Sequence, residues 1–248
     1  MRIEQNKPKC FAAVFPHSDD FTIFAGGTML KLLDCGWTGY FIRLTNDEKD
    51  SHNLSIGHTI YNIEQETWEV ARLMGITKVF DFNYKNHYLG TEIVTEIRHR
   101  LIFLFRLLGV DAVITFDPWC HNEENPDHTI CGIAVEQACW MAGRALDIPE
   151  LAEAGLKPHK VTEKYYVGRH EQTQDLFVDI SAYVEQKRVL LQKNVTPMNN
   201  MYYSYCQSTK EPLPLEQFID RYFIEQLYSP RTDVRYYEAF RYVAPKDY

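Results

Sequence analysis

The chain has 248 residues, a formal net charge of −8 at pH 7 and a hydrophobic fraction of 45%. This length suits one large α/β domain or two small ones, and the apolar share is that of a globular protein with a full core. The acidic balance, without any cluster of lysine and arginine, argues against nucleic acid as a partner. No apolar stretch approaches the roughly 20 residues that a membrane helix needs. We therefore expect a small-molecule ligand and no membrane contact.

The first part of the chain alternates between predicted strands and helices. Short runs rich in β-branched and aromatic residues indicate buried strands, and three helix-period segments between them end at Gly36, Gly75 and Gly109. This alternation predicts parallel strands joined by right-handed crossovers, with helices on both faces of the sheet. In chain order, the expected strands are residues 10–15, 37–45, 77–82 and 111–116, and the expected helices are 22–35, about 60–74, 93–108 and 127–146.

The second part of the chain has a less regular pattern. We expect a long connection over 147–163, followed by strands at 164–169 and 176–178, a helix at 180–193, an irregular stretch at 195–214, a short helical segment and a last strand near 236–243. The whole chain, 1–248, is predicted to be one domain, with a parallel α/β core (1–146) and a C-terminal α+β portion (147–248).

Two features of composition bear on assembly and location. Nine tyrosines occur from Tyr202 onward; they suit either stacking on sugar rings or, more commonly, a core or subunit interface, so a homo-oligomer is one expectation. Six cysteines form no CxxC pair, and residues 1–9 are polar rather than similar to the apolar part of a signal peptide. We expect reduced thiols in a cytoplasmic protein.

The motif Pro16-His17-Ser18-Asp19-Asp20 directly follows the first predicted strand. In open α/β sheets ligands bind at the carboxyl ends of strands. Two interpretations are open for this motif alone. The aspartates could cap the following helix and interact favourably with its dipole. Alternatively, the motif could supply a metal centre with a base beside it.

A second polar run, residues 116–128, follows the fourth predicted strand and should emerge at the same edge of the sheet. It ends with Asn125, Pro126, Asp127 and His128 at a predicted helix start. Together His17, Asp20 and His128 would make the three-ligand set of a catalytic zinc, which keeps one position for water. Asp19 would remain beside that water to take its proton.

These two motifs resemble those of the LmbE-like deacetylases, also called the PIG-L family, in which a strand ends in (A/P)HPDD(E) and a later HPDH begins a helix. The resemblance extends over almost the whole chain. Further matches are Ala25-Gly26-Gly27-Thr28 to the family's GGT, 66–75 to its E(x)nALG helix, 178–181 with Lys187 to VDI(S/T) and the following lysine, and 237–241 to its terminal EAFR.

The resemblance implies an α/β fold, a Rossmann-like three-layer sandwich with a mostly parallel central sheet, and a C-terminal segment that completes the site. It implies Zn2+, or another divalent transition metal, on His17, Asp20 and His128, with Asp19 as the general base. The implied activity is removal of an acetyl group from an N-acetylated amino sugar or glycoside.

The chain also departs from the family pattern. Ser18 replaces the usual Pro, Phe21 the usual Glu, Ile63 a frequent Arg, and Asn125 the His three residues before the last ligand. The Asn125 change matters most, because an amide can donate a hydrogen bond but cannot give up a proton at neutral pH. Catalysis would then depend on Asp19 alone, or on His121 if its loop folds back. The resemblance therefore does not identify the substrate of this chain.

Other polar residues at strand ends are candidates for substrate contact. Thr45 and Asn46 follow the second strand, and His87 follows the third. The alternative for Thr45 and Asn46 is simple turn capping. The acidic runs 46–50 and 123–127 are interpreted as solvated loops.

Three other functions compete with N-deacetylation of a sugar. The same site would hydrolyse another small amide, or a sugar-binding protein could have kept the metal and lost efficient catalysis. A magnesium-dependent receiver module with Asp81 as phosphoacceptor would leave His17 and His128 without a purpose. Metal analysis and acetate release from N-acetylated sugars separate these possibilities.

Overall fold

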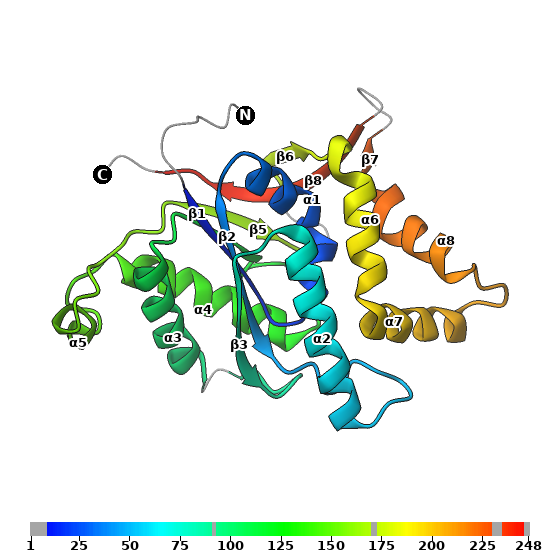
Figure 1. Ribbon diagram of the computed structural model, residues 1–248, viewed down its shortest axis with the longest axis horizontal. Helices are drawn as coiled ribbons and strands as arrows, with labels where there is room; N and C mark the ends of the chain where they lie inside the picture. Colours follow the sequence, from blue (N-terminus) through cyan, green and yellow to red (C-terminus); the bar gives the residue numbers. More distant parts are fainter. Residues whose placement is uncertain (1–8, 91–92, 170–172, 230–234, 246–248) are drawn as a thin grey trace.

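The computed structural model describes residues 9–90, 93–169, 173–229 and 235–245 (Figure 1). Its strands are β1 (Cys10–Phe15), β2 (Thr38–Thr45), β3 (Lys78–Tyr84), β4 (Ala112–Phe116), β5 (Glu163–Val167), β6 (Leu176–Asp179), β7 (Tyr228–Ser229) and β8 (Arg235–Val243). Its α-helices are α1 (Asp20–Asp34), α2 (Ile56–Met74), α3 (Val94–Leu108), α4 (Pro126–Ala142), α5 (Pro149–Glu153), α6 (Val184–Lys193), α7 (Val195–Ser208) and α8 (Leu215–Ile219).

One sheet with strand order β3-β2-β1-β4-β5-β8-β6 forms the middle layer, and β7 pairs with β8. Strands β1 to β5 pair in parallel with one another, whereas β8 runs antiparallel to both β5 and β6. Along β1, alternate side chains enter two different clusters: Ala12 and Val14 pack with α3 and α4, and Phe11 and Phe15 pack with α1 and α2. Because both faces of the sheet are covered, strand β1 is apolar throughout. The predicted three-layer, mostly parallel α/β fold is confirmed.

The topology places two loops at one crevice. From β1 the chain moves outward to β2 and β3, then returns to β4 on the other side of β1. The loops that leave the carboxyl ends of β1 and β4 therefore diverge from neighbouring strands, which is the arrangement that opens ligand-binding crevices in α/β sheets. Residues 16–19 and 117–125 occupy these two loops.

The prediction of an irregular stretch at 195–214 is wrong, because α7 covers most of it. Asn, Thr, Ser and Tyr have low helix propensity and Pro197 interrupts the pattern, but proline is tolerated in a first helical turn. Tertiary packing overrides propensity here: Met198 is buried, and the rings of Tyr202 and Tyr205 lie 5.5 and 5.0 Å from that of Phe218. These tyrosines form core, the commoner of the two interpretations.

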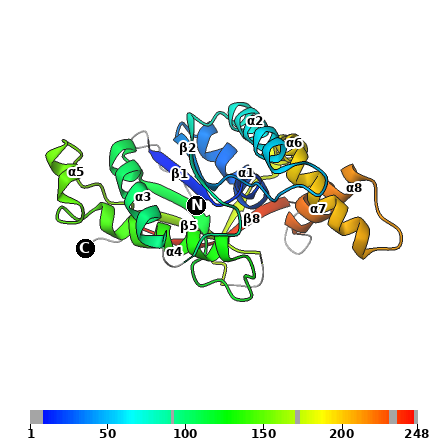
Figure 2. The ribbon, with the colours of Figure 1, turned by 90° about the horizontal axis from the view of Figure 1, so that it is seen from below.

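Two smaller differences concern the middle of the chain. The fourth helix ends at Ala142 rather than near residue 146, and the connection after it contains the short helix α5. Helices α5 and α8 lie at opposite ends of the molecule, and α7 and α8 lie beside α6 (Figure 2). Within the described ranges, no helix is long and apolar enough to cross a bilayer.

A buried ion pair joins the C-terminal strand to the helices on one face of the sheet. Lys187 Nζ on α6 lies 2.6 Å from Glu238 Oε1 on β8, and both side chains are 0% exposed. Glu238 also accepts the backbone N–H groups of Gly27 and Thr28 on α1, at 2.9 and 2.7 Å, and Lys187 donates to the carbonyl oxygen of Ile23. Three sequence motifs, GGT, the lysine and EAFR, thus meet in one buried network.

Gly27→Ala is expected to destabilise the protein by about 1–3 kcal/mol, the usual cost of overpacking a core. A Cβ at Gly27 would lie 2.6–2.9 Å from three side-chain atoms of Ile180, including its Cβ, which cannot rotate away. Gly26→Ala is the matched control, because its nearest neighbours would be 3.7 Å away. The control should be neutral or stabilising by up to about 1 kcal/mol through helix propensity. Urea unfolding measures both, and equal effects would contradict this account.

Candidate metal centre

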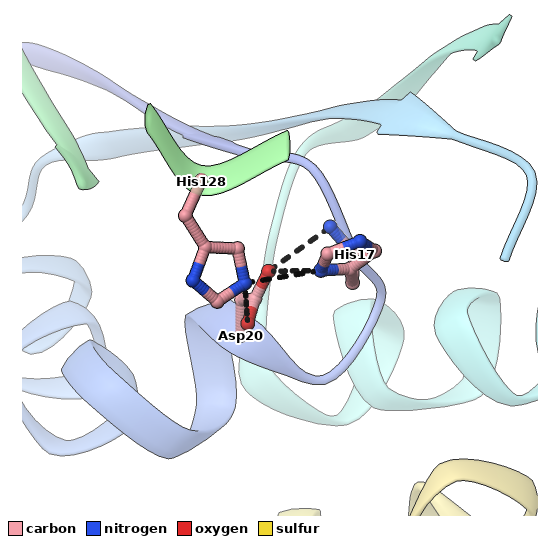
Figure 3. A group of neighbouring side chains, drawn as sticks. All are labelled: His17, Asp20 and His128. Atoms are coloured by element: carbon pink, nitrogen blue, oxygen red, sulfur yellow. Dashed lines mark hydrogen bonds and ion pairs between the residues drawn. The ribbon is translucent and has the colours of Figure 1, made fainter. Parts of the chain in front are cut away.

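Three buried side chains meet at the crevice. His17 follows β1, Asp20 begins α1 and His128 lies in the first turn of α4, and one ligand atom from each lies within 4.8 Å of the others (Figure 3). Nδ1 of His17 is 3.1 Å from Oδ2 of Asp20, and Nε2 of His128 is 3.3 Å from Nδ1 of His17 and 3.6 Å from Oδ1 of Asp20. These atoms form a small cage of two nitrogens and one carboxylate.

The loop after β2 fixes the backbone of residues 16–18 through hydrogen bonds. Asp47 accepts the backbone N–H of Ser18 at 3.0 Å and the hydroxyl of Thr45 at 2.9 Å. The backbone N–H of Thr45 donates to the carbonyl oxygen of Pro16 at 2.9 Å, and Arg43 contacts Asp47 at 3.4 Å. Residues 16–18 are thereby fixed where β1 ends.

The loop after β4 is fixed by different contacts. Asp117 forms a bidentate ion pair with Arg241 of β8, at 2.5 and 2.9 Å. Asn125 caps α4 by accepting the N–H of Asp127, and the ring of Phe116 stacks on that of His128 with centroids 3.8 Å apart. This side of the site therefore depends on the C-terminal strand.

Two further carboxylates, not predicted from the sequence, lie behind the histidines. Oδ2 of Asp127 is 3.2 Å from Nε2 of His17 and Oε2 of Glu123 is 3.2 Å from Nδ1 of His128. Their side chains are 0% and 3% exposed, so the interpretation of 123–127 as a solvated loop is wrong for both. The one available signal was their closeness in sequence to His128, since acidic residues in a loop are ordinarily solvated.

Asp19 lies buried among other carboxyl groups. Burial, with the charges of Asp50 and Asp20, raises the pKa of Asp19 well above its usual value, and burial beside Asp47 raises the pKa of Asp50 to about 6. Burial opposes a charge on His17, but Asp20 and Asp127 outweigh it and raise the His17 pKa well above its usual value. The site therefore favours positive charge at its centre. Two imidazoles and a carboxylate with this surplus of negative charge fit a divalent cation.

The model of the GlcNAc-PI de-N-acetylase family, PIG-L, matches residues 12–139, a range that includes all three side chains and Asp19. The chain belongs to the PIG-L family. A diacetylchitobiose deacetylase of Thermococcus kodakarensis is 28% identical over 185 residues, which cover 73% of this chain and 67% of that protein.

Solved structures of other proteins share this fold. An N,N'-diacetylchitobiose deacetylase from Pyrococcus horikoshii superposes with a TM-score of 0.78 at 23% identity, covering 98% of this chain and 88% of that one. GalB, a 4-carboxy-2-hydroxymuconate hydratase from Pseudomonas putida, has a TM-score of 0.72 at 18% identity over 97% and 98% of the two chains. Because the fold also carries a hydratase, the activity of this PIG-L chain has to be argued from its site.

The three residues predicted to contact the substrate differ in their exposure and in their contacts. Thr45 is 0% exposed, which leaves no surface for a substrate. The Asn46 side chain bonds to Glu48 and closes a turn, as the alternative interpretation states. His87 is exposed at the rim, with its ring centroid 6.3 Å from that of His17 and its backbone N–H on Asp127.

Two positions bear on the proton that a leaving amine needs. His121 is exposed in the loop after β4, and no described contact connects it with the three candidate ligands. Asn125, where PIG-L proteins usually have histidine, is half-buried, and its side-chain oxygen is used as the helix cap.

Proposed function

We propose that this PIG-L protein is a metal-dependent hydrolase that removes the acetyl group from an N-acetylated amino sugar or its glycoside. The observation that carries the proposal is the buried group of His17, Asp20 and His128, with Asp19 beside Asp20 in the chain. Two imidazole nitrogens and one carboxylate oxygen are the ligand set of catalytic zinc sites. We therefore propose zinc as the metal, with another divalent transition metal as the alternative.

The mechanism separates the residues that would hold the metal from the residue that moves protons. His17 would bind through Nδ1, since its Nε2 faces Asp127, and His128 would bind through Nε2. When bound, the metal lowers the pKa of a water molecule and polarises the amide carbonyl. Asp19 takes the proton from the attacking water. Burial and the neighbouring carboxyl groups raise the pKa of Asp19, which makes its carboxylate a stronger base.

The departing amine also needs a proton, and Asn125 cannot supply one. We assign this second transfer to Asp19 as well: the carboxylic acid formed in the first step returns its proton to the leaving nitrogen. This leaves Asn125 the roles of helix cap and hydrogen-bond donor.

The substrate and the setting of the protein are further parts of the proposal. Since a relative is named a diacetylchitobiose deacetylase, N,N'-diacetylchitobiose and N-acetylglucosamine are the first substrates to test. None of the six cysteines forms a disulfide within the described ranges, which supports a reducing, cytoplasmic location. We also propose that 1–248 forms a single domain and that the chain forms a homo-oligomer, which light scattering tests.

Removal of the metal is expected to abolish acetate release. The purified protein should hold about one zinc per chain. Dialysis against a chelator should stop acetate release from the active members of a panel of N-acetylated sugars, and added Zn2+ should restore it. Absence of any bound transition metal would contradict the proposal. Metal binding without acetate release from any sugar or small amide would instead favour a sugar-binding protein.

A further inference from the structure

The two candidate histidine ligands differ in how their outer nitrogens are held. For His17, Nε2 faces Asp127, and that carboxylate accepts the backbone N–H groups of His87 and Leu89 at 2.6 and 3.1 Å. The backbone of the loop after β3 thus fixes Asp127. For His128 the outer nitrogen is Nδ1, and no backbone group in the described part of the chain bonds to it.

Glu123 fills this place. His128 Nδ1 and Glu123 Oε2 are both fully buried, neither has a hydrogen-bond partner among the described residues, and the two atoms lie in ion-pair contact at 3.2 Å. A buried donor or acceptor without a partner is costly, so each of these atoms is the natural partner of the other. A carboxylate acceptor at Nδ1 holds the proton there and leaves the lone pair on Nε2, which faces His17 and Asp20.

Glu123 is itself held from a neighbouring strand. Its Oε1 accepts the backbone N–H of Asn125 at 3.0 Å and lies 3.6 Å from Nη1 of Arg169. Arg169 follows β5, which pairs with β4 in the sheet. This ion pair ties Glu123 to the strand next to β4.

We propose that Glu123 is the positioning residue of His128, setting its tautomer and ring orientation for metal binding, and that Arg169 holds Glu123 in place. Glu123 is not part of the HPDH motif. The neighbouring Glu124 is exposed and has no contact with His128 among the described residues. This inference rests on the metal site of the proposed function.

Zinc affinity of the full-length protein, measured by competition with a chromophoric chelator, tests the proposal. Glu123→Ala should weaken Zn2+ binding by about 10–100-fold, the usual effect of removing such a partner. Glu123→Gln keeps an oxygen acceptor without the charge and should lose less, and Arg169→Gln should fall between Glu123→Ala and wild type. Glu124→Ala is the matched control and should bind Zn2+ as wild type does.

A second measurement separates positioning from general stability. In long-range 1H–15N spectra, His128 should carry its proton on Nδ1 in the wild type and lose this preference in Glu123→Ala, while thermal unfolding shows that the variant is folded. Unchanged zinc affinity in Glu123→Ala, with strong loss in His128→Ala, would overturn the inference and leave the metal site intact. Unchanged affinity in His128→Ala would instead overturn the proposed metal site.

Discussion

Replacing Asp19 by alanine is expected to lower kcat for acetate release by about 10²–10⁴-fold, the usual contribution of a general base. The variant loses the group that we assign to both proton transfers. Asn125 cannot supply a proton, and no described contact connects His121 with the three candidate ligands. KM should change little, because Asp19 acts on the water and the leaving nitrogen rather than on the sugar. Steady-state kinetics with the best substrate of the panel measures the effect.

Controls distinguish this loss from a loss of metal. Asp19→Asn keeps the size of the side chain and should be as inactive as Asp19→Ala, with zinc content equal to that of the wild type. Asp34→Asn, at the exposed far end of α1, should be fully active. Wild-type kcat in Asp19→Asn would show that the assigned base is wrong, whatever its metal content.

Removing the carboxylate of Glu238 should destabilise the protein by about 3–5 kcal/mol, because the ammonium group of Lys187 would remain buried without a counter-charge. Glu238→Ala would also leave the N–H groups of Gly27 and Thr28 without their acceptor. For a chain of this size the loss corresponds to a fall in Tm on the order of 10 °C. Differential scanning fluorimetry or urea unfolding would detect it.

The exposed pair Lys193–Glu69, 2.9 Å apart with both side chains about half exposed, is the matched control. Glu69→Gln should leave Tm nearly unchanged, because solvent screens exposed ion pairs. The double variant Lys187→Met with Glu238→Gln removes both buried charges and should recover part of the stability lost in Glu238→Ala. A small effect of Glu238→Ala, similar to that of Glu69→Gln, would contradict this account of the buried pair.

The parallel half of the fold could be predicted because its pattern is local. Strands buried on both faces give continuous apolar runs such as residues 10–15, and the helices α2 and α3 end at glycines with positive φ, Gly75 and Gly109. The candidate ligands could be predicted for the same reason, since each lies within a few residues of a strand end. Helix α7 could not, because packing rather than propensity holds it.

The supporting contacts of the site are the part that the sequence does not reveal. Asp127 and Glu123 lie in a polar, acidic segment that looks solvent-exposed in the sequence. Only the fold buries their side chains behind His17 and His128. Thr45 shows the converse case: a polar residue at a strand end that the loop uses entirely for its own hydrogen bonds. Contacts with residues distant in sequence bury Asp127 and Glu123 and occupy the hydroxyl of Thr45. No local sequence pattern encodes these contacts.

The position of β8 between β5 and β6 has a consequence for biosynthesis. His17, Asp20 and His128 are all translated well before Arg241, which clamps the loop of His128 through Asp117, and before Glu238, which ties down α1. While the polypeptide is still emerging from the ribosome, β5 has an unpaired edge, the loop after β4 lacks its Arg241 clamp and α1 lacks the Glu238 carboxylate. A stalled nascent chain that already contains the complete HxDD and NPDH motifs should therefore be catalytically silent until β8 inserts.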